Sequence, residues 1–242
     1  MTYTRGGCAL ALALIAGGAC GPAAEDTPAV AAYAPAIDPT HFVATVDNEF
    51  YPLVPGTTFI YEKAGDAERV EVVVTDERRQ IMGVPCLVVR SREYEEGSLV
   101  EVTEDWYAQD TDGNVWYFGE ATQTYANGQP TGTAGSWEAG VDGAMPGIIM
   151  QRAPRVGDRY RQEYYVGHAE DMGEVMRLDD SVTVPWGTFG HVLVTRDWTP
   201  LEPGLEEQKY YAPGVGLLLE AEGDARVELV RVTSPSGPER PA

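Results

Sequence analysis

Residues 106–120 read Trp-Tyr-Ala-Gln-Asp-Thr-Asp-Gly-Asn-Val-Trp-Tyr-Phe-Gly-Glu, and the fold prediction starts from them. Aromatic and apolar residues stand on both sides of an Asp-Gly-Asn turn, a pattern that predicts two antiparallel strands joined by a tight connection. Residues 210–220, Tyr-Tyr-Ala-Pro-Gly-Val-Gly-Leu-Leu-Leu-Glu, follow the same plan, with a Gly-bearing turn and an apolar strand that ends in Glu. The chain therefore predicts the same hairpin twice.

Short runs rich in β-branched and aromatic residues precede the first hairpin, with Gly and charged turns between them. They span 42–46, 57–62, 69–75, 84–90 and 98–107. The runs recur about every ten residues without a long amphipathic segment between them, which favours antiparallel neighbours over β-α-β units. The sequence thus predicts an all-β, antiparallel fold.

The order of motifs before the first hairpin recurs before the second. Residues 154–163 are similar to 52–62, and Val54 and Val156 are 102 positions apart, while Tyr107 and Tyr211 are 104 apart. A period of this length favours duplication of a five-strand unit over a solenoid of short repeats. We therefore predict two similar five-strand halves forming a curved sheet or barrel with little helix. The two halves are expected to form a single β domain at 40–233, with the repeats at about 52–121 and 154–222.

Three further segments lie outside the repeated pattern. Residues 122–153 are Gly-rich and broken by Pro, and we expect an inserted, packed loop there. Residues 168–176 have the composition of one or two helical turns, and we expect a short helix. Residues 234–242 are rich in Ser, Pro and Gly, which predicts a disordered tail.

The first 19 residues have the layout of a signal peptide. Arg5 is followed by an apolar run at 9–16, too short to span a membrane, and then by small residues. Small residues directly ahead of Cys20 resemble a bacterial lipoprotein cleavage site, which predicts lipidation of Cys20. Residues 20–39, rich in Ala and Pro, are expected to be a flexible tether.

A second interpretation of the leader stays open, because Gly17 stands where lipoprotein sites prefer Leu. Ordinary cleavage near Ala19 or Ala24 would release a secreted protein with an unpaired Cys20. The sequence therefore predicts an exported protein, either lipid-anchored to the bacterial envelope or secreted. Contact with a membrane is expected only through the N-terminal lipid.

The charge of the chain restricts its partners. With 17 Lys and Arg against 38 Asp and Glu, the formal net charge is −21 and the pI is about 4.3. A nucleic-acid backbone would be repelled, and cations or cationic partners fit better, although solubility of an exported protein also explains the charge. Two of the three cysteines lie in the leader, which excludes a disulfide framework, and Cys86 is expected to be a buried small hydrophobe.

The first hairpin turn carries a candidate metal site. Asp110, Asp112 and Asn114 alternate around a Gly, so three oxygen-bearing side chains could hold Ca²⁺. The alternative is structural, since Asp and Asn side chains bind turn backbone and Gly supplies the positive φ. The second hairpin makes its turn without a carboxylate, which favours the structural interpretation. No cofactor is expected, with Ca²⁺ as the alternative.

Features that occur in one repeat only are the better candidates for function, because features common to both are explained by the fold. This criterion selects the predicted ligand-binding residues Trp116, Tyr117, Trp137, Glu138, Asp142, His168, Glu170 and Asp171. A His beside carboxylates is also typical of a surface ion pair. No Gly-x-Ser-x-Gly elbow and no zinc-spaced Cys or His set is present in the sequence.

Three motifs carry a family resemblance: residues 105–120, Gly-Ser-Trp-Glu-Ala-Gly-Val-Asp-Gly at 135–143, and residues 210–216. Together they resemble a group of bacterial exported proteins of unknown function, which implies export but no activity. The Ala-Pro-Gly-Val-Gly segment is also similar to one in envelope β-proteins, including curved half-barrels that hold acyl chains.

We predict from these observations a non-enzymatic envelope lipoprotein that binds a small apolar or aromatic-stacked ligand, a lipid, or an envelope partner. One alternative is a Ca²⁺-assisted hydrolase of a glycan or ester, with acids from the first hairpin and from Glu138 to Asp142. Another is a purely structural envelope module. The sequence makes no prediction of the oligomeric state.

Overall fold

The computed structural model describes residues 33–235. The predicted signal peptide, Cys20, most of the predicted tether and residues 236–242 lie outside this part of the chain. Its described residues are nearly all antiparallel β-structure, and one 3₁₀ turn, η1 (Pro39–His41), precedes the first strand. The predicted all-β fold class is confirmed.

The strands vary in length from two to 14 residues. In chain order they are β1 (Phe42–Val43), β2 (Val46–Asn48), β3 (Tyr51–Leu53), β4 (Thr58–Lys63), β5 (Glu68–Ile81), β6 (Val84–Glu95), β7 (Ser98–Asp110), β8 (Val115–Ala126), β9 (Gln129–Gly132), β10 (Trp137–Glu138), β11 (Met145–Met150), β12 (Arg159–Arg161), β13 (Glu163–Tyr164), β14 (Met172–Val184), β15 (Gly187–Trp198), β16 (Glu206–Ala212), β17 (Gly216–Glu222) and β18 (Ala225–Thr233).

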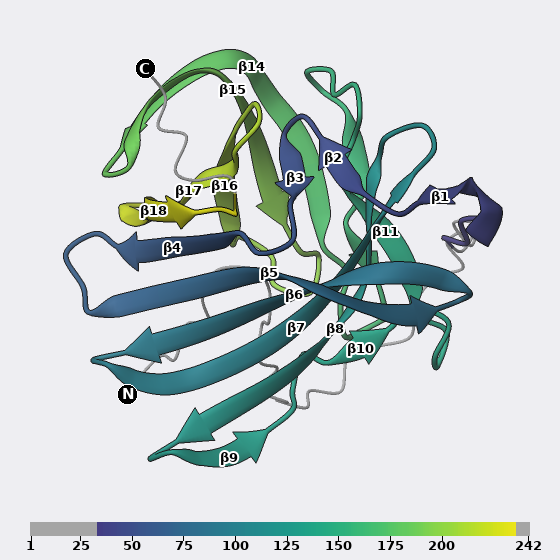
Figure 1. Cartoon of the computed structure of the whole chain (residues 1–242), viewed down its shortest axis with the longest axis horizontal. Coiled ribbons are helices and arrows are strands. Elements are labelled where there is room, and N and C mark those ends of the chain that lie inside the picture. The colour runs from purple at the N-terminus through teal and green to yellow at the C-terminus, as the bar shows by residue number, and fades with distance from the viewer. Residues whose placement is uncertain (1–32, 236–242) are drawn as a thin grey trace, which may run out of the picture.

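Most of these strands join one strongly curved sheet (Figure 1). Its order is β12-β14-β15-β16-β17-β18-β4-β5-β6-β7-β8-β11-β13, so β4 to β8 form one five-strand meander, and β12 with β14 to β17 forms the other. Strand β18 pairs with both β17 and β4 and thereby joins the two meanders into a continuous sheet. The predicted strand groups are thus neighbours in space as well as in sequence.

The chain itself nearly closes the sheet. Its path begins with β12 and ends with β13, and Gln162 alone separates these two strands in the sequence. The buried Gln162 side chain donates a hydrogen bond from Nε2 to Oδ2 of Asp197, 3.0 Å away. This contact ties the seam between β12 and β13 to strand β15, and the curved sheet is nearly closed.

Both meanders begin with the same backbone arrangement. The amide of Gly56 donates to the carbonyl of Val74 at 2.8 Å, and the amide of Gly157 donates to that of Val175 at 2.9 Å. These glycines occupy matching positions in the two similar sequence segments. The local structures therefore agree where the sequences do, and an origin by duplication stays a prediction.

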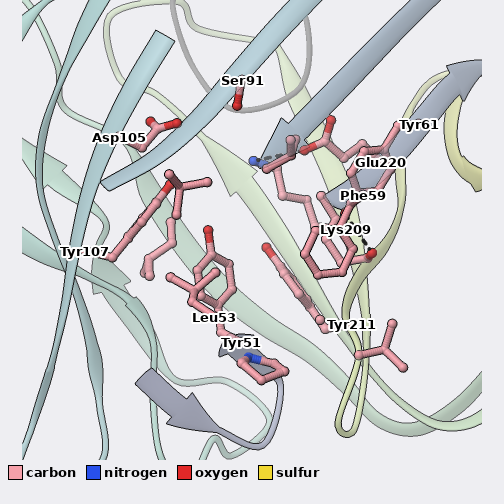
Figure 2. Close-up of a pocket in the computed structure, with 17 residues that line it drawn as sticks. Tyr51, Leu53, Phe59, Tyr61, Ser91, Asp105, Tyr107, Lys209, Tyr211 and Glu220 are labelled. Atoms are coloured by element: carbon pink, nitrogen blue, oxygen red, sulfur yellow. Dashed lines mark hydrogen bonds and ion pairs between the residues drawn. The ribbon is translucent and has the colours of Figure 1, made fainter. Parts of the chain in front are cut away.

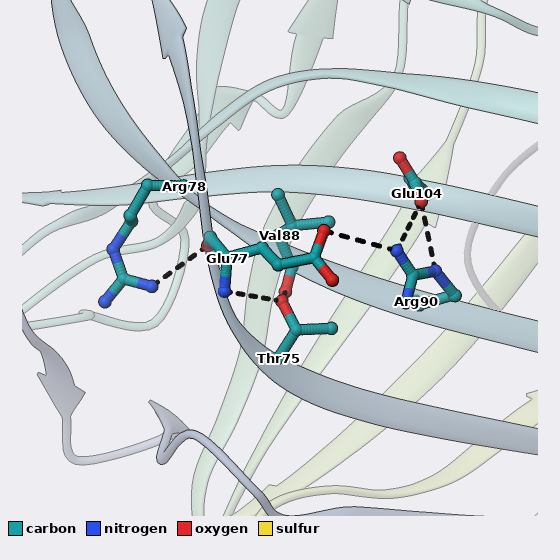
Figure 3. A network of polar contacts seen from close by, with 6 residues as sticks. All are labelled: Thr75, Glu77, Arg78, Val88, Arg90 and Glu104. Atoms are coloured by element: carbon teal, nitrogen blue, oxygen red, sulfur yellow. Dashed lines mark hydrogen bonds and ion pairs between the residues drawn. The ribbon is translucent and has the colours of Figure 1, made fainter.

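A bulge in β5 lets this long strand follow the curvature of the sheet. Its pairing with β6 changes register between Val74 and Arg78. Figure 3 shows how side chains replace the interrupted ladder: the Thr75 hydroxyl donates to the carbonyl of Val88 at 2.7 Å. On the same stretch, the Arg90 guanidinium donates to Glu104 at 2.6 Å, an ion pair on the outer face. Bulges bend a strand and increase its twist, which is what the enclosure of the concave face requires.

The separate hairpin β2–β3 is held by the turns of both meanders. Nδ2 of Asn48 donates to the carbonyl of Gly113 at 2.9 Å, in the turn between β7 and β8. The amide of Gly214, in the turn between β16 and β17, donates to the carbonyl of Glu49 at 2.7 Å. The two hairpins that the sequence predicted thus converge on a third hairpin, which places Tyr51 inside the curved sheet (Figure 2).

The prediction of a packed loop at 122–153 was wrong for most of the segment. Strand β8 continues to Ala126, and β9, β10 and β11 all pair with it. Glycines obscure the strand pattern in the sequence, but close backbone contacts require them. A Cβ at Gly119 of β8 would lie 2.3 Å from the carbonyl oxygen of Trp137. A Cβ at Gly147 of β11 would lie 2.3 Å from the backbone of Gln162. Such close backbone approach is a recognised use of Gly in strands.

Two other expectations also differ from the structure. No helix forms at 168–176; instead Tyr165 bridges to Ala169 across a tight turn, and β14 begins at Met172. Within the predicted tether, Tyr33 packs edge-on against Tyr164 at 5.4 Å and donates to the carbonyl of Pro146 at 3.1 Å. The described residues contain no helix with the length and apolarity needed to span a membrane.

Candidate ligand-binding cavity

A cavity of about 80 Å³ lies between the concave face of the sheet and the hairpin β2–β3. Figure 2 shows its walls, to which both meanders contribute. Most of the lining is apolar or aromatic, and four polar side chains interrupt it. The aromatic members are Tyr51, Phe59, Tyr61, Tyr107 and Tyr211, and the polar members are Ser91, Asp105, Lys209 and Glu220.

Tyr51 stands between corresponding tyrosines of the two meanders. Its ring centroid lies 5.5 Å from that of Tyr107 and 6.3 Å from that of Tyr211. Burial raises the pKa of all three phenols, so they stay neutral and can donate hydrogen bonds. The aromatic walls therefore carry neutral hydroxyl groups as well as ring faces.

The first meander places two carboxyl groups opposite each other. Asp105 on β7 pairs with Glu120 on β8, and both are buried, Asp105 with 1% of its surface exposed. The hydroxyl of Tyr117 donates to Oδ1 of Asp105 at 2.8 Å. Burial raises the pKa of Asp105 to about 7, against the opposing effect of this hydrogen bond. Burial and the nearby Asp105 charge raise the pKa of Glu120 as well.

A third carboxyl group extends this buried acidic region. Burial, followed by the charge of Asp171, raises the pKa of Glu163, while the nearby Trp137 indole lowers it. The indole N–H nevertheless completes no hydrogen bond of good geometry, and neither does Oε2 of Glu163. Carboxyl groups in such surroundings retain protons at pH values where exposed carboxyls have lost them.

The second meander holds an ion pair at the corresponding position. Lys209 on β16 pairs with Glu220 on β17, and Nζ lies 3.6 Å from Glu220, 3.4 Å from Asp197 and 2.9 Å from Glu207. Burial by itself lowers the pKa of Lys209, but the charges of these three carboxylates raise it overall. The lysine therefore stays charged and is fully engaged by its own protein.

Asp171 joins this second polar group. Burial raises its pKa to about 6, and the charge of Lys209 and a hydrogen bond from Thr199 oppose that effect. None of the eight residues selected from the sequence lines the cavity itself. Three of them contact polar groups next to it: Tyr117 donates to Asp105, Trp137 lies beside Glu163, and Asp171 lies near Lys209. They come from three separate strands or turns, and the sheet brings them into one interior.

The other five selected residues also lie outside the cavity lining. Trp116 donates from its indole to Asp110 at 2.8 Å, and Glu138 accepts from Arg79 at 2.6 Å. His168 is exposed and stacks on Tyr165 at 4.3 Å. The remaining two are in turns: Asp142 is exposed with φ of 50°, and Oε1 of Glu170 accepts from the Gly167 amide at 2.8 Å.

The candidate calcium ligands are engaged by the hairpin turn. Oδ1 of Asp110 accepts from the Asn114 amide at 2.8 Å, and Oδ2 accepts from Asn114 Nδ2 at 2.9 Å. Oδ1 of Asn114 in turn accepts from the Arg152 amide at 3.0 Å, while Asp112 is exposed. In the described part of the chain, no three or more His, Cys, Asp or Glu residues form a group that could hold a metal ion. Calcium binding at this turn stays a prediction.

Sequence reasoning missed Asp105, Lys209 and Glu220. The signal was nonetheless present, because Asp105 stands two residues before Tyr107 and Lys209 stands two residues before Tyr211. The two repeats therefore differ in charge at a matching position next to a shared tyrosine. Comparing the repeats residue by residue would have selected this pair by the same criterion that selected Tyr117.

No family model matches the chain, and no curated protein matches it. Among solved structures, the chain is similar to the crystal structure of a "putative lipoprotein" from Parabacteroides distasonis, with 15% sequence identity and a TM-score of 0.39. The match covers 76% of this chain and 98% of that chain. A likeness at this TM-score carries no argument about function, and the resemblance to a family of exported proteins stays a prediction.

Proposed function

We propose that this is an exported protein of the bacterial envelope that holds a small ligand inside its curved sheet and does not transform it. The observation that carries the proposal is the cavity between the two meanders, lined mostly by aromatic and apolar side chains with a few polar groups. That combination is typical of small-molecule sites, where apolar walls provide affinity and polar groups fix orientation.

The size of the cavity restricts the ligand. A volume of about 80 Å³ has room for several water molecules, whereas sites for drug-sized ligands span roughly 300–1,000 Å³. A compact molecule or chemical group therefore fits better than an extended acyl chain. Stacking on Tyr51 or Tyr107 agrees with the aromatic-stacked ligand predicted from the sequence.

Binding is better supported than calcium-assisted hydrolysis. The acids that the hydrolase would use are engaged elsewhere: Asp110 accepts hydrogen bonds from Asn114 and Trp116, and Glu138 pairs with Arg79. None of these five residues lines the cavity, and neither do Asp112 and Asp142. The acids predicted for hydrolysis therefore lie outside the cavity on which the binding proposal rests.

Native mass spectrometry of the purified protein tests the proposal. We expect a non-covalent adduct of low mass that is lost on denaturation. The variant Val72→Phe, which adds a ring to a lining residue of β5, should lose the adduct. Val73→Phe places the same ring on the opposite face of the same strand and should retain it. An identical adduct in both variants, or none in the wild type, would contradict binding in this cavity.

The location is tested separately. We propose that Cys20 carries the lipid, on the evidence of the small residues ahead of it and the preceding apolar run. Cys20→Ser should move the protein from the membrane fraction to the soluble exported fraction without changing the adduct. Unchanged membrane association of Cys20→Ser would exclude the lipid anchor and leave the cavity proposal intact.

A further inference from the structure

We propose that the ligand class is a small organic ammonium ion, with Asp105 as its counter-ion and the cavity tyrosines as its walls. This inference rests on the proposed function and specifies the chemistry of the same cavity. Three observations lead to it: a cavity carboxyl group without a cationic partner, a lysine that is already engaged, and aromatic rings on the remaining sides.

Asp105 is the polar group of the cavity that lacks a charge partner. It lines the cavity, where Figure 2 shows it beside Tyr107, and Oδ1 accepts a hydrogen bond from Tyr117 at 2.8 Å. Among residues 33–235, no Lys, Arg or His forms an ion pair with it. An ionised carboxylate in this position is costly unless a cation accompanies it, and a ligand could supply that cation.

Lys209 does not offer a complementary site for an anion. Its Nζ lies within 3.6 Å of three carboxylates, from Asp197, Glu207 and Glu220. An anionic ligand would have to approach three negative charges to reach this one positive charge. Burial and repulsion by neighbouring carboxylates raise the pKa of Glu120 and Glu163, so these groups hold protons and supply no cation to Asp105.

The aromatic walls favour an organic cation over a metal ion. Tyr51, Tyr107 and Tyr211 lie side by side with centroid separations of 5.5 and 6.3 Å, and Phe59 and Tyr61 add rings to the lining. Aromatic faces attract weakly hydrated ammonium groups, whereas Ca²⁺ and Mg²⁺ require several oxygen ligands. The cavity provides Asp105 and Glu220 but, within the described residues, no cluster that could hold a metal ion.

The decisive measurement is calorimetric titration of the full mature chain with probes of equal shape and different charge. Choline carries the ammonium, 3,3-dimethylbutan-1-ol is its neutral carbon isostere, and 3,3-dimethylbutanoate carries a negative charge. At pH 8 we expect choline to bind about tenfold or more tightly than the alcohol, because a cation–π contact and an ion pair contribute free energies of that size. The anion should not bind. Binding of choline should also release protons near pH 7, because it requires the ionised form of Asp105.

Matched variants locate the effect. Asp105→Asn keeps the shape of the side chain and should reduce the preference for choline to that of the alcohol, while Asp112→Asn, in the exposed turn, should bind as the wild type does. Equal affinity for choline and the alcohol, or a preference for the anion, would overturn the ammonium inference but not ligand binding. Absence of binding by every probe also overturns it, and the mass-spectrometric adduct then decides the proposed function independently.

Discussion

The two meanders carry different charges at the same cross-strand position. On β7 and β8 the opposed residues are Asp105 and Glu120, and on β16 and β17 they are Lys209 and Glu220. The change from a carboxyl group at Asp105 to an ammonium group at Lys209 thus gives the two meanders different interiors. The first meander holds carboxyl groups of raised pKa, and the second holds paired charges. The same backbone can bury either arrangement, because the carboxyl groups of the first meander can take up protons and those of the second have a lysine.

This difference assigns Lys209 a structural role and leaves Asp105 as the group that can take part in binding. The ion pair around Lys209 is satisfied by the protein itself, so its contribution is to stability. The carboxyl group of Asp105 faces the cavity without a cation, so it is the group whose state a ligand or a proton can change. Three changes test this contrast, in order of the expected effect.

Lys209→Met should be the most damaging. It leaves Asp197 and Glu220 buried without their cation, and removal of one partner of a buried pair typically costs about 3–5 kcal/mol of unfolding free energy. Lys63→Met is the matched control, because Lys63 bridges to Glu68 at 2.8 Å near the surface and should cost about 1 kcal/mol or less. Urea unfolding of both variants measures the difference, and equal losses would contradict the structural role of the buried pair.

Asp105→Asn should change the pH dependence of stability. The pKa of Asp105 rises from 3.8 in the unfolded chain to about 7 in the fold, so its favourable contribution is complete below about pH 4 and is lost as the pH rises through 7. Between those values one such group changes the unfolding free energy by about 1.4 kcal/mol per pH unit.

The Asn variant should therefore show a flatter profile and gain stability relative to the wild type at pH 8. A residual slope is expected from Asp171, whose pKa burial raises to about 6. Denaturant unfolding at pH 4 to 8 measures both profiles, with Asp112→Asn in the exposed turn as the control. Superimposable profiles of Asp105→Asn and wild type would show that Asp105 is not the group that titrates.

Asp110→Ala should have the smallest effect of the three and tests the contrast between the two hairpin turns. The carboxylate accepts from Asn114 and Trp116, and loss of turn and cap contacts of this kind costs about 1–2 kcal/mol. Asp112→Ala, in the same turn but exposed, should stay within about 0.5 kcal/mol of the wild type. If calcium raises the melting temperature of the wild type but not of Asp110→Ala, the structural interpretation of this turn is wrong.

The sequence by itself determined the strands of the first meander and the hairpin at 210–220, because alternation of apolar and polar residues and the Gly-bearing turns are local properties. The start of β14 in the second meander was instead expected to be a helix. It also predicted that Cys86 is a buried small hydrophobe, and the thiol is buried in the structure. Strands β9 to β11 escaped prediction because their glycines and prolines obscure the period of two. Gly147 of β11 is explained by its close contact with the backbone of Gln162, which lies between β12 and β13.

Only the tertiary structure decided which polar residues share the interior. Tyr117 and Asp171 were selected from the sequence as features of a single repeat, but so were Glu138 and His168, which lie elsewhere. A strand pattern tells which side chains share a face, while closure of the sheet decides which faces meet and which charges are removed from water. The proximity of Asp105 to the aromatic walls follows from that closure and from the placement of Tyr51 between the meanders.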